Sequence, residues 1–138
     1  MRRIFPAALV LAGTLAACTE TGTVPEFQDV IFATERGTFA VSDTIVARLA
    51  NRTHHTIGFN LCMTGLQRLS MGVWSYVDRG EQVCTLQIDT RLPGGEASYR
   101  EPASRLPGAG TYRLRTSVEA PIGGERLQVV TPPFTVAP

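Results

Sequence analysis

The most reactive side chains in this sequence are three cysteines, Cys18, Cys62 and Cys84, and the adjacent pair His54 and His55. Two cysteines with two histidines match the ligand count of a zinc site. Neighbouring histidines, however, point to opposite sides of an extended chain, and the sequence has none of the short Cys or His spacings typical of such sites. We therefore predict no metal site and no cofactor.

Sequence signatures of catalysis are also absent. The chain has no Lys, no Gly-x-Ser-x-Gly turn, no phosphate-binding glycine loop and no His-Glu-x-x-His run. Its 13 basic residues, all Arg, nearly balance 12 acidic ones and give a formal charge of +1. Such a balance provides no basic stripe for nucleic acid. We expect a protein that is not an enzyme and does not bind nucleic acid.

The N-terminal segment has the organisation of an export signal. Two arginines precede an apolar run of about a dozen residues, which is too short to span a bilayer. The sequence Leu15-Ala16-Ala17-Cys18 resembles the bacterial lipobox, and this resemblance implies cleavage before Cys18 and lipidation of its thiol. We predict a signal peptide over 1–17, a lipidated Cys18 with a short tether over 18–26, and one domain over 27–138. Residue 19 is Thr and not the Asp that resembles a signal for retention in the inner membrane. We therefore expect a lipid-anchored protein of the outer membrane that faces the periplasm.

Export leaves Cys62 and Cys84 as an even pair in an oxidising compartment, which favours a disulfide. Two free thiols are the alternative. Strict alternation complicates the pairing, because it places Cys62 on the face opposite Phe59 and Leu61, whereas Cys84 shares a face with Leu86. A bulge near Cys62 or a bridge outside the core would resolve the conflict.

From residue 27 onward, apolar residues recur with a period of two and are interrupted by Gly, Pro, Asn and Asp. In the segment 43–51, for example, Ile45, Ala47 and Leu49 alternate with Thr44, Val46 and Arg48. This pattern predicts an all-β, antiparallel, immunoglobulin-like sandwich with seven to nine short strands. The candidate segments are 30–34, 38–41, 43–51, 56–63, 74–77, 83–89, 97–100, 111–118, 127–130 and 134–136.

The segment from Leu106 to Tyr112, Leu-Pro-Gly-Ala-Gly-Thr-Tyr, resembles a tyrosine corner. In that motif, a tyrosine near the start of a strand donates a hydrogen bond to the backbone a few residues upstream. The alternative is an ordinary core tyrosine that follows a loop.

Several motifs together resemble a bacterial Ig-like domain family found in small cell-envelope lipoproteins. They are Thr44–Asn51, Asn60-Leu61-Cys62, Leu66-Gln67-Arg68 followed by Trp74, Val83-Cys84-Thr85, Leu92-Pro93-Gly94, Gly110-Thr111-Tyr112-Arg113-Leu114 and Phe134-Thr135-Val136. The resemblance covers roughly residues 27–137 and implies the fold and the disulfide, but no activity. Pro-Gly followed by Gly-x-Tyr is also distantly similar to intracellular proteinase inhibitors of sandwich shape.

Trp74 and Tyr76 are two residues apart and would point to the same face of a strand. They lie inside the loop between Cys62 and Cys84, with Arg68 and Arg79 nearby in the sequence. Trp, Tyr and Arg are enriched at binding hot spots, so these four residues form a candidate recognition surface. The alternative is that the aromatic residues pack in the core. We expect a lipid-anchored, non-catalytic binding or structural module with an envelope protein as partner. A protease inhibitor that presents a rigid loop is the second hypothesis.

Overall fold

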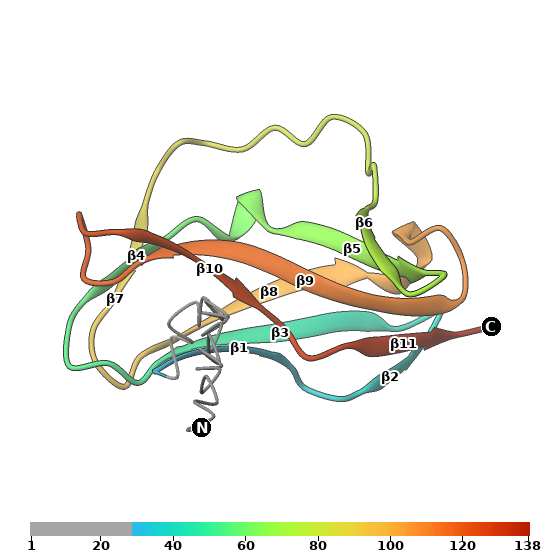
Figure 1. Ribbon diagram of the computed structural model, residues 1–138, viewed down its shortest axis with the longest axis horizontal. Coiled ribbons are helices and arrows are strands. Elements are labelled where there is room, and N and C mark those ends of the chain that lie inside the picture. The colour runs from blue at the N-terminus through green and yellow to red at the C-terminus, as the bar shows by residue number, and fades with distance from the viewer. Residues whose placement is uncertain (1–28) are drawn as a thin grey trace, which may run out of the picture.

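The computed structural model describes residues 29–138, which form two β-sheets packed face to face (Figure 1). The first sheet is antiparallel and has the strand order β1-β3-β8. Its strands are β1 (Val30–Thr34), β3 (Thr44–Asn51) and β8 (Glu96–Pro102). The predicted signal peptide, Cys18 and its tether lie outside the described residues. Between residues 29 and 138, no helix is long and apolar enough to cross a bilayer.

The second sheet is centred on β9 (Gly110–Glu119), which pairs with β10 and β11 along one side and with β4 and β5 along the other. Beyond these, β6 pairs with β5, β7 pairs with β4, and β2 pairs with β11 in parallel. The strands are β2 (Thr38–Ala40), β4 (Ile57–Phe59), β5 (Gly65–Ser70), β6 (Val73–Tyr76), β7 (Asp89–Arg91), β10 (Arg126–Val130) and β11 (Phe134–Ala137). This arrangement confirms the predicted immunoglobulin-like sandwich.

The core forms where the alternating strands of both sheets turn their apolar side chains inward. In β3, Ile45, Ala47 and Leu49 are at most 1% exposed, as the alternation predicts. In β9, Tyr112 and Leu114 are fully buried. The rest of the buried cluster includes Val30, Phe32, Phe39, Ile57, Phe59, Leu66, Val118, Phe134 and Val136.

The predicted tyrosine corner is confirmed. The hydroxyl of Tyr112 donates a hydrogen bond of 2.7 Å to the carbonyl oxygen of Gly108, which has a φ of 87° that favours glycine. Arg68 braces the same loop, because its guanidinium donates to the carbonyl oxygens of Pro107 and Ala109 at 3.3 and 2.9 Å. Both interactions fix the turn that leads into the central strand of the second sheet.

The continuous strand predicted over 56–63 is wrong beyond Phe59. There Asn60 ends the strand and begins a short 3-10 turn, η1 (Leu61–Met63), by accepting a hydrogen bond from the Cys62 amide on its side-chain oxygen. Met63 points to solvent and is 63% exposed. The chain then forms β5, a strand that the alternation does not predict.

The strand predicted over 83–89 is also wrong, since strand pairing resumes only at Asp89. Leu86, predicted to share a buried face with Cys84, is 90% exposed. Residues 29–138 contain eleven strands, more than the seven to nine predicted, and β5 is the one that lies outside the candidate segments. A second 3-10 turn, η2 (Ala103–Arg105), follows β8.

Candidate recognition surface

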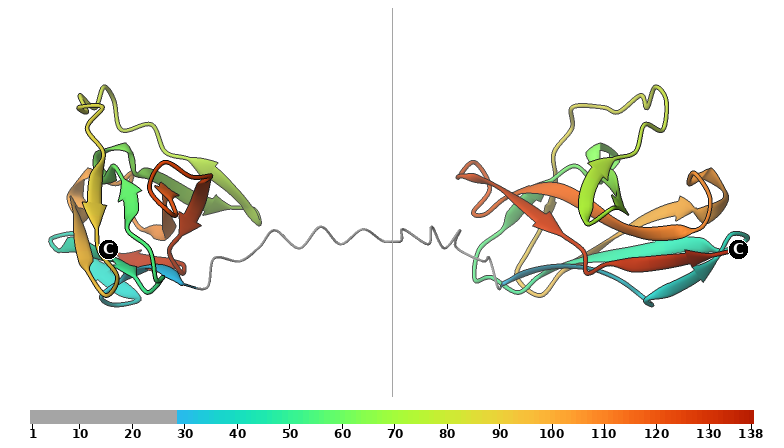
Figure 2. Two further views of the ribbon diagram at one scale, coloured as in Figure 1. Left: turned by 90° about the vertical axis from the view of Figure 1, so that its left-hand side faces the viewer. Right: turned by 45° about the vertical axis from the view of Figure 1, so that its right-hand side comes forward.

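The most unusual feature of the fold is an excursion of the chain at one sheet edge. β6 and β7 follow each other along this edge: Tyr76 pairs with Gln67 of β5, and Asp89 pairs with Phe59 of β4. Between them, residues 78–88 leave the sheet as an arch without helix or strand, which we call the strap (Figure 1). η1 interrupts the neighbouring strands at the same level. Figure 2 shows the strap standing clear of both sheets.

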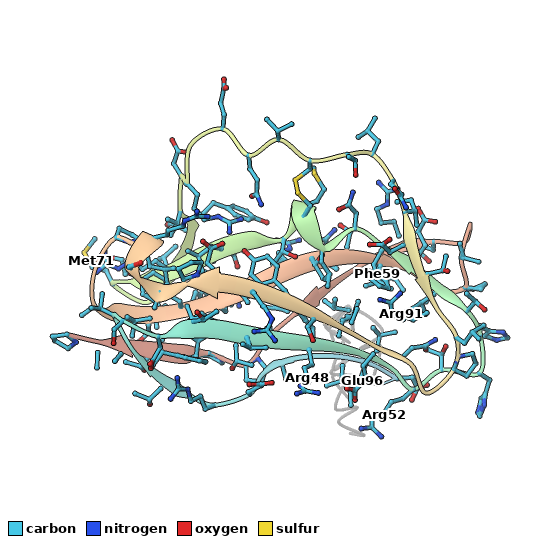
Figure 3. All side chains as sticks on the ribbon, turned by 180° about the vertical axis from the view of Figure 1, so that it is seen from behind. Arg48, Arg52, Phe59, Met71, Arg91 and Glu96 are labelled. Atoms are coloured by element: carbon cyan, nitrogen blue, oxygen red, sulfur yellow. A yellow bond between two sulfur atoms is a disulfide. The ribbon has the colours of Figure 1, made fainter. Side chains whose placement is uncertain are left out.

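A disulfide joins the strap to η1. Cys62 and Cys84 are bonded, with their Cα atoms 5.7 Å apart, as Figure 3 shows by the yellow bond below the arch. Beside it, the side-chain amide of Asn60 donates a hydrogen bond of 2.7 Å to the carbonyl oxygen of Thr85. The predicted pairing is thus confirmed. Strict alternation placed the two cysteines on different faces, but the rule does not apply here because the bridge lies outside the core, between two segments that are not strands.

Arg79 fixes the base of the strap. Its guanidinium donates to the Glu101 carboxylate at 2.7 Å, to the Tyr99 hydroxyl at 2.6 Å and to the carbonyl oxygen of Thr64. The ion pair is largely shielded from water, with the Arg79 and Glu101 side chains 14% and 8% exposed. Because Tyr99 and Glu101 belong to β8 and Thr64 precedes β5, Arg79 also joins the two sheets.

The electrostatics of this cluster act on Tyr99. Burial, together with the hydrogen bond that its hydroxyl donates to Glu101, raises the pKa of Tyr99 to about 12, although the positive charge of Arg79 opposes the shift. Tyr99 therefore stays protonated at neutral pH and serves as a second donor to the carboxylate. The cluster of Arg79, Tyr99 and Glu101 is structural, since the three side chains form hydrogen bonds with one another.

Above these anchors, the strap presents apolar side chains to solvent. Val83 and Leu86 are 96% and 90% exposed, and Met63 of η1 lies beside the same bridge. Exposed apolar groups gathered on one segment mark interaction sites more often than scattered single ones do. The strap thus combines fixed attachment points with exposed apolar side chains.

The structure separates the four residues of the predicted recognition surface. Trp74 and Tyr76 lie on the outer face of the second sheet, whereas Arg68 braces the tyrosine corner and Arg79 is held in the buried ion pair. Trp74 is half-buried under the guanidinium of Arg113, which lies 4.3 Å from its ring centroid. Neither aromatic residue belongs to the core cluster.

Tyr76 is 62% exposed, and one edge of its ring lies against Gly65. A Cβ atom at position 65 would come within 2.8 Å of that ring, so a larger residue there would displace the Tyr76 side chain. The outer face at this edge of the sheet therefore carries two aromatic side chains, Trp74 and Tyr76.

A shallow polar pocket lies at one end of the sandwich, but its residues do not indicate a binding site as those of the strap do. Ala50, Asn51, Arg52, Gly94 and Glu96 line it. Its buried amide, Asn51, is already satisfied by backbone and side-chain groups of the neighbouring turns. In the part of the chain that the structure describes, three or more potential metal ligands nowhere gather in one place.

No protein-family model and no curated protein matches the chain. Among solved structures, it is similar in part to a mutant β-glucosidase from Listeria innocua in complex with laminaribiose. That similarity has a TM-score of 0.33 and 9% sequence identity, and it covers 76% of this chain and 16% of the other. At this level, the likeness supports no statement about activity.

Proposed function

We propose that the protein is a lipid-anchored module of the cell envelope that binds a protein partner through the strap and catalyses no reaction. The observation that carries this proposal is the exposure of Val83 and Leu86 on a segment tied down at Arg79, Cys84 and Thr85. A segment already fixed in place loses little conformational entropy on binding, so more of the contact energy becomes affinity.

The anchor follows from Leu15-Ala16-Ala17-Cys18 and its preceding apolar run. Cells that express the full chain and are fed labelled palmitate should incorporate the label, and the Cys18→Ser variant should lose it. Cys84→Ser is the matched control, because it also replaces one cysteine by serine, here a member of the disulfide, and should keep the label. Retention of label by Cys18→Ser would contradict the anchor.

The strap is tested by the double variant Val83→Ser/Leu86→Ser. Both side chains are almost fully exposed, so the melting temperature should change little while crosslinking to the partner in intact cells falls strongly. Leu92→Ser is the matched control, because Leu92 is also exposed, at 70%, but lies between β7 and β8. Crosslinks that persist in the strap variant, or disappear equally in the control, would contradict the proposal.

A protease inhibitor is the second candidate, and one observation favours it. Leu86 lies between Cys84, which is bonded to Cys62, and Asp89, which is paired in β7. If an endopeptidase cut the chain beside Leu86, both new ends would remain attached to the fold and would stay close together. In the crosslinking experiment, this candidate expects an endopeptidase as the partner, with peptide cleavage inhibited by the wild type and not by Leu86→Ser.

A further inference from the structure

The outer edge of β6 is open. Val73 follows Ser70 across the two-residue turn Met71-Gly72, and the Val77 amide donates to the Leu66 carbonyl at 2.9 Å. In this hydrogen-bonding pattern, the backbone amides and carbonyls of Val73, Ser75 and Val77 point toward β5. The amides and carbonyls of Trp74 and Tyr76 therefore point away from the sheet. Among the described residues, no backbone hydrogen bond reaches them from that side.

This edge is short, but it lacks the charges, prolines and bulges by which proteins often protect exposed strands. The sequence of β6, Val-Trp-Ser-Tyr, contains no charge, proline or bulge, and Val73 and Tyr76 are each 62% exposed. At the tip of the hairpin, Met71 is 99% exposed and holds a φ of 48°, which a non-glycine residue seldom adopts (Figure 3). An unprotected apolar edge is a template for pairing with another strand.

We infer that β6 pairs antiparallel with β6 of a second copy of this chain, around a two-fold axis at Ser75. In this register, Trp74 lies opposite Tyr76 of the second copy, and each of these pairs exchanges two backbone hydrogen bonds. All the outward amides and carbonyls of Trp74 and Tyr76 in both copies are thereby satisfied. The edge is complementary to itself, as a two-fold interface requires.

Side chains support the same register. Trp74 and Tyr76 lie on one face of the sheet, so the axis brings each Trp ring beside the Tyr ring of the second copy as a cross-strand aromatic pair. No like charges within β6 meet across the axis. Because only one short strand per copy takes part, the contact is smaller than a standard stable interface, and dimerisation should depend on protein concentration.

The register makes a specific prediction for Ser75. As the central pair, the two Ser75 residues form a non-hydrogen-bonded pair with Cα atoms about 4.5 Å apart, which is within reach of a disulfide. The full chain carrying Ser75→Cys, purified in detergent and oxidised, should form a covalent dimer. Ser98→Cys, exposed in the middle of edge strand β8, is the matched control and should remain largely uncrosslinked. The wild-type chain controls for crosslinking through Cys18.

A charge exchange tests the same axis without a new thiol. Ser75→Lys and Ser75→Glu each place two like charges opposite one another and should abolish the concentration-dependent dimer in sedimentation experiments. An equal mixture of the two variants should restore it, and both should melt like the wild type because Ser75 is exposed. A wild type that stays monomeric at every concentration, equal crosslinking of the two Cys variants, or a dimer that survives Ser75→Lys would overturn the inference.

Discussion

Replacing Arg79 with methionine is expected to lower the free energy of unfolding by about 3–5 kcal/mol, because the change leaves the Glu101 carboxylate buried without its cation. The two side chains are only 14% and 8% exposed, and their nearest atoms lie 2.7 Å apart. The Tyr99 hydroxyl would still donate to the carboxylate, but a neutral donor cannot replace the positive charge. Urea unfolding followed by circular dichroism measures the loss.

Two further variants make this result specific. Arg48→Met removes an arginine that is 56% exposed beside Glu35 and Glu96, and it should change stability little because water screens that cluster. The double variant Arg79→Met/Glu101→Leu removes both buried charges and should recover most of the lost stability. If Arg79→Met destabilised the protein no more than Arg48→Met, the buried pair would not secure the base of the strap.

Replacing both Cys62 and Cys84 with alanine is expected to lower the free energy of unfolding by about 2–5 kcal/mol, the usual effect of removing a native disulfide from a small domain. The bridge spans a sequence separation of 22 residues. In the chain-entropy model, a loop of this size contributes about 3 kcal/mol by restricting the unfolded chain. The midpoint of thermal or urea unfolding measures the change.

The wild-type protein treated with a reducing agent should lose the same stability, since both treatments remove the same bridge. Its far-UV circular dichroism should persist, because neither cysteine belongs to the buried core. An unchanged midpoint in the double variant, or two titratable thiols in the unfolded, unreduced protein in addition to any at Cys18, would contradict the structural role of the bridge.

Alternation in the sequence predicts strands well where one face of a strand meets the core and the other meets solvent. β3 and β9 satisfy this condition, and their inward residues Ile45, Leu49, Tyr112 and Leu114 are buried as expected. The tyrosine corner was equally accessible to sequence reasoning, because the glycines before Tyr112 and the corner hydrogen bond belong to one short segment.

Alternation fails in the strap because no strand of residues 29–138 pairs with it there. Cys84, Leu86 and Ile88 have the spacing of a strand, but without a partner strand they share no buried face: Cys84 is bonded to Cys62, Leu86 is 90% exposed, and Ile88 lies against Gly58. Asn60 was the available signal that the preceding strand ends, since asparagine favours the first position of a helical turn. The pairing of Arg79 with Glu101 leaves no such signal, because residues far apart in sequence meet only through the fold.

The strap also gives the fold an insertion point. β6 and β7 pair with separate strands, so the register of the sheet does not depend on how many residues connect them. Residues 80–83 lie between the attachments at Arg79 and Cys84, and doubling the length of a flexible loop adds only about 0.6 kcal/mol of closure entropy. Segments of different length and composition can therefore occupy this interval, through divergence or by grafting of foreign peptides, while the sandwich beneath keeps its core.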